Sequence, residues 1–334
     1  MAEFQRIAAF HQLTVADVIQ ETADAVSLVF DTSLDYRPGQ FLTLRCGPVA
    51  RCYSLSSSPD VEDRPQVTIK RIPDGYGSAW VCDNVRPGTV LDVLPPAGIF
   101  TPGSLDDNLL LFAGGSGITP VISIVKSALA RGSGRIVLVY ANRDESSVIF
   151  ASALRSLADA HPERLLVIHW LESLQGLPTA RHFAQLKPFT GFQAFLCGPT
   201  PFMEVTSRAL RSLGMPRDRI HVERFISLSG NPFEEAAEEV SAEADATLTV
   251  DLDGSVRTFP WPRHKKMLDL MLDKGLAAPY SCREGACSAC ACRIEQGEVK
   301  MLQNEILDQE DLDDGIVLAC QSLPVTDEVK ITYT

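Results

Sequence analysis

The sequence predicts three domains: an antiparallel β-barrel, a doubly wound α/β domain and a smaller α+β domain. Three observations support this fold class. Short apolar segments with turn residues between them fill residues 1–105, strands alternate with helices over residues 106–226, and strands with one helix return over residues 247–334. A chain of 334 residues is long enough for two or three ordinary domains.

The first domain contains four short apolar segments, which read AVSLVFDT, FLTLRC, QVTIKRI and TVLDVLPP. They are separated by turn residues, as in YRPGQ, RIPDGYG and VRPGT. Short strands at such regular spacing are typical of an antiparallel barrel.

The second domain opens with the apolar run NLLLFA, followed by a glycine turn and the helical pattern ITPVISIVKSALARG. The alternation continues through RIVLVYANR, SALRSLADAHP, LLVIHWL, QAFLCG and PFMEVTSRALRSLG. This pattern predicts a parallel sheet with helices on both faces. Residues 227–246 are acidic and poor in large apolar side chains, so we expect an acidic linker there.

Composition and charge exclude several classes of protein. The chain is 45% hydrophobic and 22% charged, which is typical of a soluble globular protein. It has no apolar run of membrane-spanning length and no signal-peptide pattern at its start, so we expect a cytoplasmic protein that does not bind membranes. The net charge of −13 also argues against a nucleic-acid partner.

The acidic excess lies in the C-terminal third. Residues 246–334 carry fifteen acidic and nine basic side chains, whereas residues 1–225 carry twenty-two and twenty-one. One interpretation is solubility, and the other is an acidic surface that steers this domain toward a basic protein partner.

Four cysteines have the spacing of an iron–sulfur motif: Cys282-x4-Cys287-x2-Cys290, followed after twenty-nine residues by Cys320. This is the plant-type pattern for a 2Fe–2S cluster, which needs four thiolates. The alternative is zinc, which usually takes two separated Cys-x2-Cys pairs where this sequence has one. Cys292 follows the loop as a strand begins, and we expect it to be a buried apolar side chain.

Three further motifs fall where cofactors bind. LFAGGSGITP at residues 111–120 follows a strand and opens a helix, as a pyrophosphate-binding turn does. FLCGPTPFM at residues 195–203 ends another strand of the same domain, and ARCYSLSSSP at residues 50–59 lies in the barrel. Each motif alone is also compatible with a plain turn or with tight strand–helix packing.

Taken in this order, the motifs resemble the ferredoxin–NADP reductase superfamily, in the form with a C-terminal plant-type ferredoxin (β-grasp) domain. The resemblance implies that FAD is bound by Arg51, Cys52, Tyr53, Ser54, Gly75, Gly77, Ser78, Thr119 and Phe225. It implies that the pyridine nucleotide is bound by Gly114, Gly115, Ser116, Gly117, Arg143, Cys197, Gly198 and Pro199. Longer strings, such as VTIKRIPDGYGSAWVCDNVRPG and DLDDGIVLACQ, resemble the reductases of 3-ketosteroid 9α-hydroxylase systems and, less closely, those of phenylacetyl-CoA epoxidase or desaturase systems.

The resemblance implies an electron path. Reduced nicotinamide releases two electrons as hydride, a 2Fe–2S cluster accepts one, and a flavin can mediate between them. We therefore expect electrons to pass from NADH to FAD, to the cluster and to a Rieske-type oxygenase of steroid degradation. The candidate catalytic residues are Ser54, beside the flavin, and Cys197, beside the nicotinamide. We expect a monomer. The competing hypothesis is a redox-sensing iron–sulfur protein.

The choice between NADH and NADPH depends on the strand end YANRDE. Arg143 could pair with a 2′-phosphate, whereas Asp144 or Glu145 could accept a hydrogen bond from a ribose 2′-hydroxyl. The resemblance favours NADH and leaves NADPH open.

Overall fold

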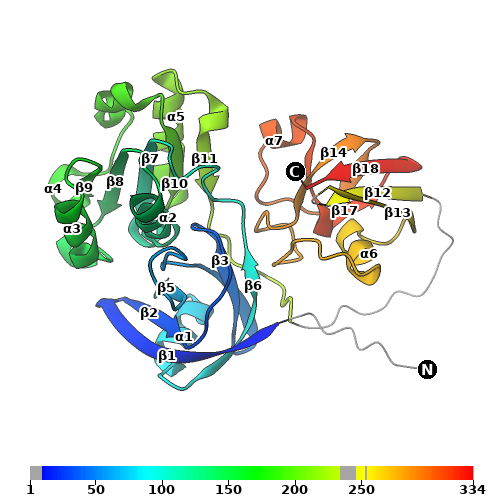
Figure 1. Cartoon of the computed structure of the whole chain (residues 1–334), viewed down its shortest axis with the longest axis horizontal. Coiled ribbons are helices and arrows are strands. Elements are labelled where there is room, and N and C mark those ends of the chain that lie inside the picture. Colours follow the sequence, from blue (N-terminus) through cyan, green and yellow to red (C-terminus); the bar gives the residue numbers. More distant parts are fainter. Residues whose placement is uncertain (1–9, 234–245, 253, 334) are drawn as a thin grey trace. The chain divides into compact units, whose positions relative to one another are not determined.

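The structure is a computed structural model that describes residues 10–233, 246–252 and 254–333. The described residues form two compact units, one made mainly of residues 11–225 and the other mainly of residues 226–333, and each is described by itself (Figure 1). The first unit contains two domains, the predicted barrel and the predicted α/β domain.

The barrel domain is a six-stranded sheet in the order β4-β3-β6-β1-β2-β5. Its strands are β1 (His11–Thr22), β2 (Ala25–Phe30), β3 (Phe41–Cys46), β4 (Val49–Ser54), β5 (Gln66–Lys70) and β6 (Val90–Ala97). An isolated bridge between Leu55, just after β4, and Val67 of β5 joins the two edges of the sheet. The predicted antiparallel barrel is therefore confirmed, and one helix, α1 (Tyr76–Asn84), follows β5.

The α/β domain is a parallel sheet in the order β11-β10-β7-β8-β9. Its strands are β7 (Leu109–Gly114), β8 (Ile136–Asn142), β9 (Leu165–Leu171), β10 (Gln193–Cys197) and β11 (Ile220–Glu223). All six residues of β7 are buried, because a parallel strand covered on both faces presents no side chain to water. The chain order reverses between β7 and β10, and ligands of such sheets bind beyond the carboxyl ends of the strands at this point.

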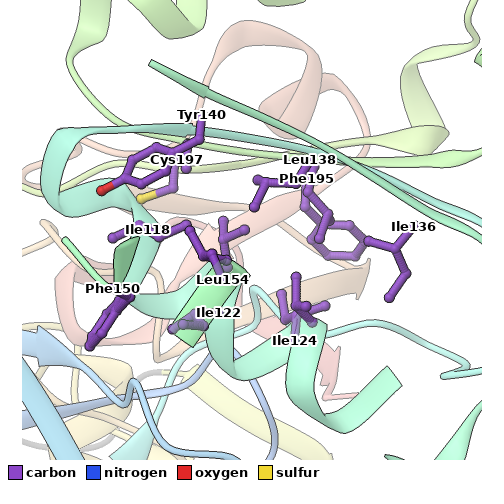
Figure 2. Packing of buried hydrophobic residues seen from close by; sticks show 14 of the residues in the cluster. Ile118, Ile122, Ile124, Ile136, Leu138, Tyr140, Phe150, Leu154, Phe195 and Cys197 are labelled. Carbon is purple, nitrogen blue, oxygen red and sulfur yellow. The ribbon is translucent and has the colours of Figure 1, made fainter. Parts of the chain in front are cut away.

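Helices cover both faces of this sheet. α2 (Ile118–Arg131) and α3 (Ala151–Ala160) pack on one face, and α5 (Thr200–Ser212) packs with the 3₁₀ segment η3 (His182–Phe189) on the other. Figure 2 shows the first of these cores, where Ile118 of α2 lies beneath Tyr140 and Cys197 of the sheet and Ile124 lies beneath Phe195. The predicted doubly wound arrangement is confirmed.

Buried polar contacts join the barrel to α2. The Ser123 hydroxyl donates to the Ser57 carbonyl at 2.6 Å, and the hydroxyls of Ser127 and Ser58 lie 2.7 Å apart. All three of Ser57, Ser58 and Ser123 are at most 1% exposed. Because unpaired buried hydroxyls are costly, these bonds favour one fixed arrangement of the two domains within this unit.

The second unit contains a mixed five-stranded sheet in the order β13-β12-β18-β14-β16 and a separate pair, β15 with β17. The strands are β12 (Ala246–Leu252), β13 (Ser255–Trp261), β14 (Ala291–Gln296), β15 (Val299–Met301), β16 (Ile316–Leu318), β17 (Ser322–Pro324) and β18 (Glu328–Thr332). Helix α6 (Met267–Asp273) packs on the sheet with Trp261 in the core, and α7 (Gln309–Asp313) follows β15. The predicted α+β domain is thus confirmed.

The greater part of the predicted acidic linker, residues 234–245, lies outside the described residues. Residues 226–233 are described and belong to the second unit. Within the described ranges, no helix has both the length and the apolar character needed to cross a membrane.

Candidate cofactor sites and iron–sulfur centre

The predicted flavin motifs meet at the start of helix α1. The side chain of Arg51, on β4, lies over Gly77 in the first helical turn, and its Cγ is 2.6 Å from where a Cβ on Gly77 would stand. The first turn of α1 has no acidic residue, and no side chain caps it. A guanidinium beside the free N–H groups of a helix start is a suitable site for a pyrophosphate.

The turn before α1 is fixed by Ser78. Its hydroxyl accepts from the N–H of Ile72 at 3.0 Å and donates to the carbonyl of Gly75 at 3.2 Å. The predicted contact of Ser78 with FAD phosphates therefore competes with a structural role. The Cβ positions of Gly75 and Gly77 are also crowded, by Ile72 at 3.0 Å and by the Arg51 side chain at 2.6 Å.

Strand β4 presents the other predicted flavin residues. Ser54 is 4% exposed at the strand end, and the Cys52 thiol lies 3.3 Å from the hydroxyl of Thr43. Burial raises the pKa of the Tyr53 hydroxyl, which contacts the Cys46 thiol, so this ring is a neutral and fixed surface. Phe225, just after β11, is 49% exposed, so its ring is accessible for stacking on a cofactor.

The two glycine turns of the nucleotide domain lie against one another. Residues Cys197 of β10 and Ala113 of β7 are paired in the parallel sheet, so both turns begin at the same edge. A Cβ on Gly117 would stand 2.1 Å from the Cys197 carbonyl oxygen, and one on Gly114 would stand 2.7 Å from Pro199 Cδ. Only glycine permits this approach, and no side chain caps the start of α2, which suits a pyrophosphate.

Ser116 and Thr119 complete this turn. The Thr119 hydroxyl donates to the Ser116 carbonyl at 3.0 Å, and Thr119 is 2% exposed. The hydroxyl of Tyr140, on β8, donates to the carbonyl of Gly115 at 3.1 Å. Gly115 has a φ of 52°, a conformation that glycine adopts at little cost.

Cys197 and Glu223 are paired on neighbouring strands at this edge. Burial raises the pKa of the Cys197 thiol well above its ordinary value, and the Glu223 carboxylate raises it further. Burial also raises the pKa of Glu223 to about 8. A neutral thiol is a poor nucleophile, which agrees with a role in positioning rather than in covalent chemistry.

An open pocket of about 350 Å³ lies at the carboxyl ends of β8 and β9. Hydrogen bonds from Ser146 and then from Ser147 lower the pKa of Asp144, so this carboxyl stays ionised. The pocket is lined by Asp144, Glu145, Ser146, Leu171, Ser173 and Leu174. Two acidic side chains and two serine hydroxyls can hydrogen-bond the hydroxyls of a ribose, and their negative charge repels a 2′-phosphate at this place.

Arg143 forms an ion pair outside this pocket. Its guanidinium lies 3.6 Å from the carboxylate of Asp24, in the β1–β2 turn, and Lys70 at the end of β5 lies at the same distance from that carboxylate. Asp24 thus neutralises part of the positive charge of Arg143, the residue that the sequence suggests as a partner for a 2′-phosphate.

The four predicted cluster cysteines converge. The Cys287 sulfur accepts from the N–H of Cys282 at 3.4 Å, and the Cys290 sulfur accepts from the N–H of Cys320 at 3.5 Å. The Cys282 thiol also contacts those of Cys287 and Cys320, and the thiol of Cys290 contacts that of Cys320. All four residues are at most 8% exposed.

The backbone of the cysteine loop is arranged to hold thiolates. The N–H groups of Glu284 and Ala286 both donate to the Cys282 sulfur at 3.4 Å. Contacts with Cys287, Cys320 and these N–H groups lower the pKa of Cys282 below its ordinary value. The four thiols are thus buried and close together, and backbone N–H groups donate to three of their sulfurs. These donors therefore fit a 2Fe–2S cluster.

Cys292 lies apart from this set, on β14. It is 3% exposed, and burial raises its pKa above its ordinary value. It lies against the hydroxyl of Tyr333. The prediction that Cys292 packs as an apolar side chain agrees with this placement.

Two side chains at the nucleotide site were missed by the sequence analysis. Asn142, the last residue of β8, is 7% exposed, and within the described chain neither atom of its amide has a hydrogen-bond partner. Lys70 directs its ammonium toward Gly115, 4.0 Å from where a Cβ would stand. Asn142 could have been found as a polar residue at the end of a parallel strand, whereas Lys70 comes from the barrel and no local pattern marks it.

Three family models match the chain in the order of its domains. Residues 12–101 match an oxidoreductase FAD-binding domain, residues 111–208 an oxidoreductase NAD-binding domain, and residues 250–325 a 2Fe–2S iron–sulfur cluster binding domain. The predicted FAD, pyridine nucleotide and 2Fe–2S cofactors are therefore confirmed at the level of domains.

Full-length relatives share this organisation. The chain is 56% identical to a 3-ketosteroid-9-alpha-monooxygenase ferredoxin reductase component of Rhodococcus rhodochrous and 53% identical to that of Mycolicibacterium smegmatis, with 96% of each chain covered in both cases. It is 34% identical to one subunit of the 1,2-phenylacetyl-CoA epoxidase of Escherichia coli, over 97% of this chain and 98% of that one.

Solved structures support the fold. Phthalate dioxygenase reductase, a modular protein for electron transfer from pyridine nucleotides to [2Fe–2S], matches with a TM-score of 0.57 and 22% identity over 97% of this chain and 98% of that one. Full-length CYP116B46 from Tepidiphilus thermophilus matches with a TM-score of 0.69 and 24% identity, over 97% of this chain and 42% of that one. The site, the domains and the relatives agree: the chain belongs to the family of monooxygenase ferredoxin reductase components, oxidoreductases with FAD-binding, NAD-binding and 2Fe–2S domains.

Proposed function

We propose that this protein takes electrons from NADH and delivers them singly, through FAD and the 2Fe–2S cluster, to the Rieske-type oxygenase of a 3-ketosteroid 9α-hydroxylase. The observation that carries the steroid assignment is the 56% identity to a reductase of that system over 96% of both chains. A reductase of the epoxidase type, at 34% identity, is the second candidate. We place the protein in the cytoplasm as a monomer.

Each cofactor has a group of residues suited to it. Arg51 and the start of α1 suit the phosphates of FAD, and Tyr53, Ser54 and Phe225 suit its ring. When bound, the flavin supplies the change from two-electron to one-electron transfer. The residues of the chain hold the cofactors in place and exclude water.

We assign the pyridine nucleotide to the edge where the two glycine turns meet. Gly117 packs on the Cys197 carbonyl, and the uncapped start of α2 suits the pyrophosphate. The Cys197 thiol is neutral and fully buried in the core at this edge, so we assign it to positioning the turn beside the nicotinamide. The pocket beside Asp144 suits the ribose of NADH, since an ionised carboxylate repels a 2′-phosphate.

Reconstitution with purified oxygenases tests this proposal. With NADH and a 3-ketosteroid oxygenase, we expect 9α-hydroxylated product, and with NADPH we expect a much lower rate. Product with a phenylacetyl-CoA epoxidase but not with the steroid oxygenase would move the protein to the second candidate group.

The acidic C-terminal third predicts that electron delivery to the oxygenase slows as the salt concentration rises, because exposed charges are screened within about 8 Å at physiological ionic strength.

A further inference from the structure

Helix α2 carries a polar stripe. Thr119, Ser123 and Ser127 recur every four residues along it, and Lys126 lies on the same side of the helix. Both serines are 0% exposed. Buried hydroxyls need hydrogen-bond partners, and those of Ser123 and Ser127 find them outside their own domain.

Their partners lie in a short loop of the barrel domain, residues 56–58, which we call the serine loop. The Ser123 hydroxyl donates to the Ser57 carbonyl at 2.6 Å, and the hydroxyls of Ser127 and Ser58 lie 2.7 Å apart. The helix and the loop belong to the same compact unit. Two consecutive residues of the barrel are therefore bonded to two successive turns of α2.

Lys126 adds a charged contact to the same loop. Its ammonium donates to the Ser56 carbonyl at 3.2 Å and forms an ion pair with Glu62. The other carboxylate oxygen of Glu62 accepts from the N–H of Ser58 at 2.8 Å. The Lys126 side chain is 14% exposed, so solvent and salt screen this pair less than a surface pair.

The serine loop is itself fixed to the barrel. The Ser57 hydroxyl accepts from the N–H of Gln66 at 2.8 Å and lies 2.7 Å from the hydroxyl of Tyr36. The hydroxyls of Ser56 and Thr68 lie 2.7 Å apart. A displacement of α2 is therefore opposed by bonds that reach the strands of the barrel.

These contacts lie close to both proposed cofactor sites. Ser54, at the end of β4 and assigned to the flavin ring, stands two residues before Ser56. Thr119 and the glycine turn assigned to NADH stand one helical turn, about 6 Å, before Ser123. The bonded region thus joins the strand of one site to the helix of the other.

Hydride transfer depends on how these two sites face one another. The step breaks one C–H bond of NADH and passes the proton with both electrons to oxidised FAD, which leaves NAD⁺ and reduced flavin. Reacting atoms must lie about 3–3.5 Å apart, and a displacement of about 1 Å can cost about a hundredfold in rate. Apolar contacts between the domains, such as that of Phe100 with Phe195, are not directional, whereas hydrogen bonds are.

We propose that Ser123, Lys126 and Ser127 are positioning residues for hydride transfer: they hold α2, whose start receives NADH, against the serine loop that continues the flavin-binding strand. They act through the helix and the loop. The proposal rests on the proposed sites of FAD and NADH.

Rapid mixing of the holoprotein with NADH tests this role. In Ser123→Ala/Ser127→Ala the limiting rate of flavin reduction at saturating NADH should fall at least about tenfold. FAD content and the NADH concentration that gives half the limiting rate should stay native, because the residues assigned to both sites remain. Alanine is the better helix former, so α2 itself is not weakened. The matched control is Thr206→Val in α5, which removes a buried hydroxyl that donates to the Phe202 carbonyl of its own helix at 2.8 Å.

Titration with NAD⁺ gives a second measurement without turnover. The change in the visible spectrum of bound FAD reports contact with the nicotinamide, and the midpoint of the titration reports affinity. The double variant should show a smaller spectral change at the native midpoint. Lys126→Met should lower the limiting rate, and Lys126→Arg should retain most of it, because a guanidinium can still pair with Glu62.

A native limiting rate and a native spectral change in the folded double variant would overturn the proposal. A change confined to the midpoint, or an equal loss in Thr206→Val, would also overturn it. If the double variant does not fold, Lys126→Met and Lys126→Arg decide by the same two measurements, and equal rates in these two variants would contradict the role of Lys126. Failure of the proposed function would look different, since NADH would then not reduce the flavin of the native protein.

Discussion

The side chain of Arg51 lies over Gly77, with its Cγ 2.6 Å from the position that a Cβ at residue 77 would take. The contact joins strand β4 to the first turn of α1, two elements that are separated by β5. It places a guanidinium at a helix start that has no side-chain cap, a pairing that suits a bound anion.

Arg51→Ala should therefore weaken FAD binding. Loss of hydrogen bonds to a charged group costs about 1.5–3 kcal/mol, or roughly ten- to a hundredfold in affinity. Gly77→Ala should also release FAD, because the new methyl group displaces Arg51. Flavin fluorescence after dilution measures both. Gly103→Ala is the control, since nothing lies within 4 Å of its Cβ position. Full FAD retention in Arg51→Ala would place the phosphates elsewhere.

Gly117→Ala should impair the use of NADH without affecting the binding of FAD. Its Cβ would stand 2.1 Å from the Cys197 carbonyl oxygen, and backbone on both sides leaves little room to relax. We expect NADH-driven flavin reduction to fall at least tenfold, while FAD content stays native because the barrel site is untouched. Single-turnover reduction at several NADH concentrations is the measurement. An unaltered rate in folded Gly117→Ala would show that this turn does not hold NADH.

Asp24 should influence the choice of nucleotide through Arg143. Their side chains lie 3.6 Å apart, so Asp24→Asn frees a guanidinium near the ribose pocket. We expect the ratio of kcat/KM for NADPH to that for NADH to rise in Asp24→Asn and to return toward the native value in Asp24→Asn/Arg143→Ala. If the single variant leaves the ratio unchanged, Arg143 lies out of reach of a 2′-phosphate.

Glu223 should make stability depend on pH. Burial raises its folded-state pKa from 4.5 to about 8, so the folded protein holds this proton more strongly than the unfolded chain. The stabilising contribution is full below about pH 4.5 and is lost as the pH rises to about 8. The thermal midpoint of FAD release should therefore fall with pH more steeply in native protein than in Glu223→Gln. Glu163→Gln, at an exposed site, should behave as native. Parallel profiles for native protein and Glu223→Gln would contradict the assignment.

The cluster site was the easiest to predict from the sequence, because a single loop supplies Cys282, Cys287 and Cys290 and the chemistry fixes their spacing. Strand β1 was missed because its pairing with β2 is irregular at two places, between Val15 and Asp17 and between Gln20 and Thr22. Such irregularities break the alternation that reveals a strand.

Contacts between distant segments could not be predicted. Arg51 and Gly77 were both named from motifs, but their packing depends on how α1 returns to β4. Asp24 and Lys70 belong to no motif, and each gains its role from a partner far along the chain. Local sequence determines helices, strands and turns, whereas these pairs arise only when the sheet order is set.

The serial path from flavin to cluster is tested most directly with Cys287→Ser. The substitution removes one thiolate from the cluster, while the FAD and NADH sites lie in the other compact unit. After rapid mixing with NADH, the account predicts native flavin reduction and native ferricyanide reduction, with electron delivery to the oxygenase lost. Delivery to the oxygenase at the native rate from folded, FAD-loaded Cys287→Ser lacking its cluster would contradict it.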